Sequence, residues 1–222
     1  WAFEALAVTQ FKDNEWQKHF FDIDMEKSFH EFKFNYLIPE LINRLDQVER
    51  YITDGGNEEE YKNNLLLLKN EIKKIEKSAE KKTFGKMKEL IPDKFNKKVC
   101  DYTRKYLEKK KKEHSKLFNQ ASEKSDKKYT ELLTSYAEDK DKVMKLKEDY
   151  NNISLADLVT NKNSFETLVE EDNKLVQLTK PIYKEPESEY GRAHFYAPYK
   201  KIFGMKIDTL YFNIAFIWLT SI

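Results

Sequence analysis

The feature that most constrains this chain is a stripe of apolar side chains in the segment 61–79. Its members follow one another in alternating steps of four and three residues, at Tyr61, Leu65, Leu68, Ile72, Ile75 and Ala79. This is the spacing of a coiled-coil seam, which places all these side chains on one side of a helix. Such a helix must cover its stripe with another helix, so the sequence predicts a helical hairpin or a coiled coil.

A second series of apolar residues has a similar rhythm and predicts further long helices. It comprises Phe95, Val99, Tyr102, Tyr106, Tyr129, Leu132, Tyr136, Val143, Leu146 and Tyr150. Helices joined by short connections fold back on one another to cover such stripes. We therefore expect a mainly α, in fact all-α, chain with an elongated coiled-coil body of two or three antiparallel helices over residues 57–151.

The composition favours long solvated helices. Charged residues make up 36% of the 222 residues, while Gly and Pro number only five each. The 40 Lys and Arg residues are balanced by 39 Asp and Glu residues, which leaves a net charge of +1. Because general affinity for phosphate needs an excess of Lys and Arg, we expect no nucleic-acid partner. The lysine run 109–112 is flanked by Glu108 and Glu113, which is typical of a solvated helix face.

Residues that could carry chemistry are scattered. Cys100 is the only cysteine, which excludes an internal disulfide and a cysteine zinc site. His19, His30, His114 and His194 lack the i, i+4 spacing of a helical metal site. The chain also has no G-x-x-x-x-G-K-[ST] phosphate-binding loop. We therefore expect no catalytic, cofactor-binding or metal-binding residue here, and no enzyme activity of this segment itself.

Shorter segments surround the predicted body. Residues 1–11 predict an amphipathic helix. Pro39 is expected to interrupt any helix through this region and to begin a new helix. The new helix should end at the Asp-Gly-Gly sequence of residues 54–56. Short helices are also expected over 154–159 and 165–178, the second with its apolar positions turned inward at Leu168, Val169, Leu175 and Leu178.

The character of the sequence changes after residue 180. The aromatic stretch 190–199 is interrupted by Gly191 and Pro198, so we expect it to be largely irregular. It suits either an anchor at a membrane interface or packing on the helical domain. Residues 207–222 are mostly apolar, and a helix of this length spans roughly 24 Å, less than the ~30 Å hydrocarbon core. They suit either part of a spanning helix or a buried core helix.

Both ends of the chain resemble one transporter family. Residues 1–11, Trp-Ala-Phe-Glu-Ala-Leu-Ala-Val-Thr-Gln-Phe, with Asn14 and Glu15, are similar to the segment after the fifth transmembrane helix of G-subfamily (White-type) ABC exporters. Residues 207–222 resemble the start of the sixth transmembrane helix of that permease family. The chain differs from the eukaryotic members in its much longer helical insert and in lacking their loop cysteine pairs, which suits bacterial relatives.

The resemblance implies a function only as part of a larger protein. The chain would be the periplasmic loop domain of an ATP-driven permease in the inner (plasma) membrane. The parent would be a homodimeric or pseudo-dimeric exporter of amphipathic or lipidic substrates. ATP and magnesium would bind to the parent's nucleotide-binding domains. The loop domain would gate the exit, bind a periplasmic partner or take part in release, and its two ends, near Phe11 and Lys206, would lie close together.

The resemblance also divides the chain. Residues 1–12 would be a membrane-proximal helix, 13–206 the extracytoplasmic helical domain and 207–222 the start of a transmembrane helix. Candidate membrane-interface residues are Trp1, Phe3, Leu6, Phe11, Arg192, His194, Tyr196, Tyr199, Tyr211 and Trp218. The alternative is a soluble coiled-coil adaptor that mediates oligomerisation and packs 207–222 in its core.

Overall fold

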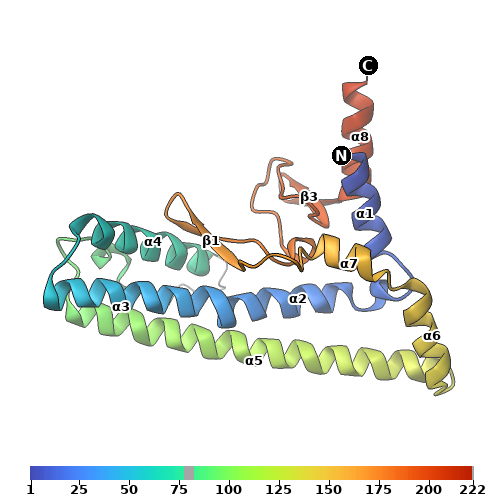
Figure 1. The fold of residues 1–222 in the computed structure, drawn as a ribbon, viewed down its shortest axis with the longest axis horizontal. Helices are drawn as coiled ribbons and strands as arrows, with labels where there is room; N and C mark the ends of the chain where they lie inside the picture. The colour runs from blue at the N-terminus through green and yellow to red at the C-terminus, as the bar shows by residue number, and fades with distance from the viewer. Residues whose placement is uncertain (78–82, 222) are drawn as a thin grey trace. The chain divides into compact units, whose positions relative to one another are not determined.

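The computed structural model describes residues 1–77 and 83–221. The chain is mainly α, as predicted, with 66% of its residues in helices (Figure 1). The helices are α1 (Ala2–Lys12), α2 (Phe21–Phe32), α3 (Ile38–Asp54), α4 (Glu58–Lys77), α5 (Lys97–Ser135), α6 (Lys140–Tyr150), α7 (Ile153–Val159) and α8 (Thr209–Thr220). Two small hairpins, β1 (Leu168–Glu171) with β2 (Lys174–Gln177) and β3 (Tyr199–Ile202) with β4 (Met205–Asp208), show that the expectation of an all-α chain is wrong.

The chain forms two compact units. Unit 1 comprises residues 1–30, 117–166 and 178–222, and unit 2 comprises residues 31–116 and 167–177.

A hairpin of α3 and α4 is the centre of unit 2. The two helices run antiparallel and pack along their length (Figure 1). Gly55, with φ of 77°, ends α3 as the Asp-Gly-Gly sequence predicts, and the Asn57 side chain accepts from the backbone N–H of Glu59 at 2.9 Å to cap α4. The hairpin partner of α4 is therefore α3, which precedes the predicted coiled-coil body.

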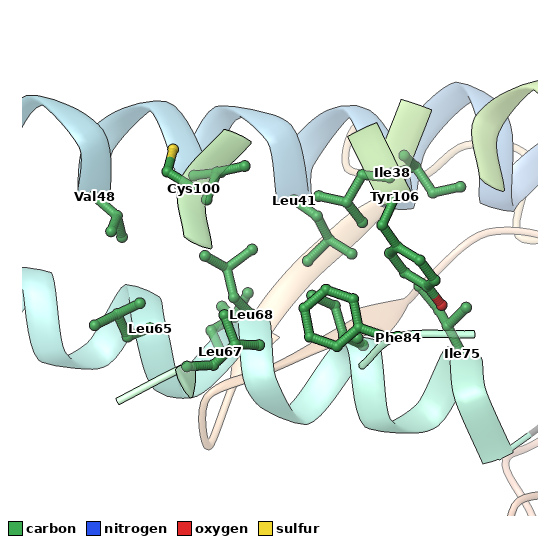
Figure 2. Close-up of a cluster of buried hydrophobic side chains, with 14 of the residues drawn as sticks. Ile38, Leu41, Val48, Leu65, Leu67, Leu68, Ile75, Phe84, Cys100 and Tyr106 are labelled. Atoms are coloured by element: carbon green, nitrogen blue, oxygen red, sulfur yellow. The ribbon is translucent and has the colours of Figure 1, made fainter. Parts of the chain in front are cut away.

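The apolar stripe of α4 lies in the core of unit 2. Leu65, Leu68, Ile72 and Ile75 are at most 3% exposed, and Tyr61 is also buried. Figure 2 shows the α4 side chains facing Ile38, Leu41 and Val48 of α3. Leu67 is buried as well, so the apolar face is wider than a two-position seam. Ala79, the last position of the predicted stripe, lies outside the described residues.

The first part of α5 completes this core. Cys100 and Tyr106 are buried in it, as Figure 2 shows, and burial raises the pKa of the Cys100 thiol. The Tyr106 hydroxyl donates to a carboxylate oxygen of Glu76 at 2.6 Å. Arg104 forms ion pairs of 2.6 Å with Asp46 and with Glu49 on α3. A buried Cys100 is in accord with a structural role for this residue.

The lysine run on α5 is not uniformly solvated. Lys109, Lys111 and Lys112 are exposed, but the side chain of Lys110 is only 12% exposed and pairs with Glu113 at 2.8 Å. The expectation of a fully solvated run is therefore wrong at Lys110. The reason is that Lys110 extends over the ring of Tyr106, which shields its aliphatic stem.

Pro39 does not break the helical path. Residues Lys33–Leu37 form a π-helical turn that joins α2 to α3, and Pro39 falls in the first turn of α3. The predicted interruption is therefore wrong. A π turn shifts the hydrogen-bond ladder locally, and proline is tolerated in a first helical turn because its missing N–H is not needed there.

Residues 165–178 are not the predicted helix. They contain the antiparallel hairpin β1–β2, in which Val169 pairs with Val176. Asp172 and Asn173 form its turn with φ of 50° and 53°, values that short polar side chains tolerate. The hairpin is attached to α4, because Glu71 accepts from the backbone N–H of Leu175 at 3.0 Å.

Unit 1 contains two smaller apolar clusters. In one, α1 contributes Ala7, Val8 and Phe11 to a core shared with Phe21 and Ile182. The other combines Phe20 with Leu132 of α5 and Val143 of α6, and includes the predicted positions Tyr136 and Leu146. The hairpin β3–β4 and helix α8 follow, with residues 207 and 208 in β4 rather than in the predicted terminal helix. Residue 222 lies outside the described residues.

Candidate functional site

Helices α1 and α8 pack side by side in unit 1 (Figure 1). Lys12 Nζ donates to Asp208 Oδ2 at 2.6 Å, and the ring centroids of Trp1 and Phe216 lie 4.5 Å apart. The prediction that the two end segments approach each other is therefore confirmed. The two segments that carry the family resemblance meet in one place.

A buried polar cluster fastens the two helices together. Glu4 of α1 accepts from Lys200 Nζ at 2.8 Å and from the backbone N–H of Tyr196 at 3.2 Å. Its second oxygen accepts from the side-chain amide of Asn213 on α8 at 2.9 Å. The side chains of Glu4 and Lys200 are 4% and 3% exposed. Because buried charges are tolerated only when they are paired, this cluster fixes α1, β3 and α8 against one another.

Helix α8 presents its apolar side chains outward. Its buried residues are Thr209 and Asn213, both polar. Its exposed apolar residues are Tyr211, Ile214, Phe216, Trp218 and Leu219, with Trp218 and Leu219 each 72% exposed. This arrangement is the reverse of a helix on a water-soluble domain, where the apolar face packs inward. An apolar surface of this kind marks a place where lipid or protein binds.

Helix α1 has one face in the core and one outside it. Phe11 is buried together with Ala7 and Val8, whereas Phe3 and Leu6 are 59% and 65% exposed. Unit 1 therefore exposes apolar side chains from α1 as well as from α8. None of the described helices is long and apolar enough to cross a membrane.

A cleft of about 700 Å³ opens beside the buried polar cluster. Trp1, Phe195, Phe212 and Phe216 supply aromatic walls, and its charged lining residues are Glu4, Arg192 and Lys200. Gly191 is needed in its wall, since it has φ of 78° and a Cβ there would lie 3.0 Å from Cζ of Phe212. The combination of aromatic walls and a few charged groups is typical of a ligand-binding site.

His194 is half-buried next to this region. Its Nε2–H donates to the carbonyl oxygen of Pro181 at 2.7 Å. Burial lowers the pKa of His194 to about 4, with the charges of Lys184 and Lys200 acting in the same direction. The imidazole is therefore neutral at physiological pH. It serves as a hydrogen-bond donor to the Pro181 carbonyl and not as a cation.

The structure separates the predicted interface residues into three groups. Trp1, Phe3, Leu6, Arg192, Tyr211 and Trp218 are exposed, His194 and Tyr199 are half-buried, and Phe11 and Tyr196 are buried. Phe11 and Tyr196 belong to the core cluster of unit 1, so they are not exposed as interface residues would be. The cause for Phe11 is that α1 is apolar on both of its faces.

No local sequence pattern predicts the cluster of Glu4, Lys200 and Asn213. A carboxylate within the apolar run Trp-Ala-Phe-Glu-Ala-Leu was the available signal. Its cationic partner lies 196 residues away, beyond the reach of any local pattern. Among the described residues, no group of His, Cys, Asp and Glu is arranged to hold a metal ion.

Comparisons of the chain with protein-family models, with curated proteins and with solved structures find no match. The likeness of the two end segments to an exporter family therefore stays a prediction.

Proposed function

We propose that this chain is an extracytoplasmic domain of an ABC exporter permease and that α1 and α8 seat it in the membrane surface. The observation that carries the proposal is the reversed polarity of α8, whose buried residues are Thr209 and Asn213 while Trp218 and Leu219 are exposed. In lipid, an apolar helix surface is solvated, and polar side chains must find partners within the protein.

The proposed family rests on the resemblance of residues 1–15 and 207–222 to G-subfamily ABC exporters. In such a parent, α1 follows the fifth transmembrane helix and α8 belongs to the beginning of the sixth. ATP hydrolysis with magnesium takes place in the parent's cytoplasmic domains, and two copies of the permease form the exporter. The domain stands on the periplasmic side of the inner membrane, where it gates the exit, binds a partner or assists release of an amphipathic or lipidic substrate.

The buried stripe of α4 argues against the adaptor alternative. An oligomerising coiled coil needs an apolar seam that is free to meet a partner helix. In this chain Leu65, Leu68 and Ile72 are at most 1% exposed and already face α3. Among the described residues, α1 and α8 do keep exposed apolar side chains, such as Phe3, Leu6 and Trp218.

Tryptophan fluorescence tests the proposal directly. A variant that keeps only Trp218 (W1F/W16F) and one that keeps only Trp16 (W1F/W218F) are mixed with phosphatidylcholine vesicles whose acyl chains carry bromine, which quenches tryptophan on contact. Trp218 is exposed on α8, whereas Trp16 packs in an apolar cluster of unit 1. We expect quenching of Trp218 and none of Trp16.

The opposite outcome identifies the alternative. If Trp218 is not quenched, and sedimentation shows a dimer in which its fluorescence is shielded from a water-soluble quencher, the apolar surface is a protein interface. The exporter-domain proposal then fails and the adaptor is favoured.

A further inference from the structure

We propose that the cleft beside Glu4 and Lys200 binds the anionic headgroup of a membrane lipid, with Arg192 as its ligand. This inference rests on the proposed function, because only a domain seated in a membrane brings the cleft to the lipid headgroups. It goes further in assigning a binding site and the charge of its occupant.

The charges that line the cleft select an anion. Glu4 and Lys200 are paired with each other at 2.8 Å, so they neutralise one another. Arg192 is exposed and makes no hydrogen bond or ion pair with the residues that the structure describes. The lining therefore carries one uncompensated positive charge. A guanidinium forms paired hydrogen bonds with phosphate oxygens, which makes arginine well suited to a phosphodiester headgroup.

The walls of the cleft suit the part of a lipid that joins headgroup and chains. Tyr190 and Phe195 are 78% and 54% exposed at the cleft. Phe216 lines the cleft from α8 and is also one of the exposed apolar residues of that helix. Trp1, at the start of α1, likewise lines the cleft and is exposed. The apolar surface thus continues into the cleft. Tyrosine, tryptophan and arginine side chains settle at the depth of lipid headgroups, because each has an apolar body and a polar end.

The competing occupant is a free anion such as phosphate. Arg192 would bind phosphate through the same hydrogen bonds. The exposed aromatic walls favour the lipid, because a free phosphate leaves their apolar area in water, whereas the glycerol and upper acyl chain of a lipid cover it.

The experiment compares two charge-matched variants of the full chain on two kinds of vesicle. Arg192→Gln removes the proposed ligand, and Arg50→Gln removes an exposed arginine of unit 2. Partitioning is measured by co-sedimentation with phosphatidylcholine vesicles and with vesicles containing about one-fifth phosphatidylglycerol. We expect Arg192→Gln to weaken partitioning onto the anionic vesicles about tenfold, and Arg50→Gln at most about twofold. All proteins should bind equally to pure phosphatidylcholine.

The outcomes separate this site from the proposed function. Equal losses for the two variants overturn the headgroup site, because general electrostatics then explains the preference. Absence of binding to either vesicle overturns the membrane seat and the headgroup site together. If sodium phosphate abolishes the Arg192-dependent gain while sodium chloride of equal ionic strength does not, the occupant is a free anion and the lipid assignment is wrong. Unchanged thermal unfolding of Arg192→Gln shows that the fold is intact.

Discussion

Helices α4 and α8 are both rich in apolar residues, but they use them in opposite ways. In α4, the stripe that includes Leu65, Leu68 and Ile72 is buried. In α8, the buried positions are Thr209 and Asn213, while the apolar side chains are exposed. The first helix builds the core of its own unit. The second leaves apolar side chains such as Trp218 and Leu219 exposed, and the proposed function places them in lipid.

The difference shows that the apolar content of a helix does not by itself tell which face is buried. A periodic stripe on a charged helix predicts a core face, because the polar residues define the solvated side. In an almost continuous apolar run, no polar face marks the solvated side. The few polar residues then show which side of the helix packs against the protein. In α8, Asn213 reaches Glu4 and Thr209 donates to the carbonyl of Ala197 at 2.6 Å. The sides of α8 without such residues carry its exposed apolar side chains.

The same substitution in the two helices should have very different effects. Leu68→Asp places an unpaired charge in the core of unit 2, and we expect a loss of about 3 to 5 kcal/mol in the free energy of unfolding. Leu219→Asp on α8 should change it by no more than about 0.5 kcal/mol, because the side chain is already exposed. Urea denaturation measures both. Lys111→Glu, at an exposed position of α5, is the control, and equal effects at Leu68 and Leu219 would refute the contrast.

Removal of the cation in the buried cluster should also be costly. Lys200→Met leaves the Glu4 carboxylate buried with only neutral donors, which we expect to reduce the free energy of unfolding by about 3 kcal/mol. The double variant Glu4→Leu/Lys200→Met should recover much of this loss, because no unpaired charge remains. A double-mutant cycle by denaturant unfolding gives the coupling. A coupling near zero would mean that the pair does not hold α1 and α8 together.

Acid should destabilise the chain through His194. Its folded pKa of about 4 lies below the unfolded value of 6.5, so the unfolded chain binds more protons between these two pH values. The stability due to the neutral imidazole is complete above the unfolded pKa and is lost as pH falls toward the folded one. We expect a loss of about 2 kcal/mol by about pH 5.

The matched variants for this test are His194→Gln and His19→Gln. His194→Gln should flatten the dependence of unfolding free energy on pH between about 6.5 and 4. His19 is less buried, and its pKa is lowered to a smaller extent by burial. Its substitution should leave most of the slope in place. An unchanged slope in His194→Gln would exclude this histidine as the cause.

The spacing of apolar residues predicts the helices whose buried face is marked by a regular stripe. The α4 stripe was found because Leu65, Leu68 and Ile72 recur at helical spacing within a charged background. The hairpin β1–β2 was missed because Leu168, Val169 and Leu175 also fit a helical face. Its decisive signal was the turn pair Asp172 and Asn173, which needs positive φ.

The candidate site was only partly predictable for a different reason. Exposed aromatics such as Trp1, Tyr211 and Trp218 are visible in an apolar run. Their supporting cluster is not, because Glu4 and Lys200 come together only when distant segments pack. Which face of α1 is covered was equally hidden, since Phe3 and Phe11 are both apolar.

The most direct test of the central claim measures whether the outer face of α8 enters lipid. A spin label is placed at Leu219→Cys, or at Ile153→Cys on α7 as an exposed control, in a Cys100→Ala background that removes the native thiol. Electron paramagnetic resonance then compares collisions with oxygen, which concentrates in bilayers, and with a water-soluble nickel chelate. On addition of phosphatidylcholine vesicles, the account predicts that the label at 219 gains access to oxygen and loses access to nickel, while the label at 153 does not change. A label at 219 that stays accessible to nickel would contradict it.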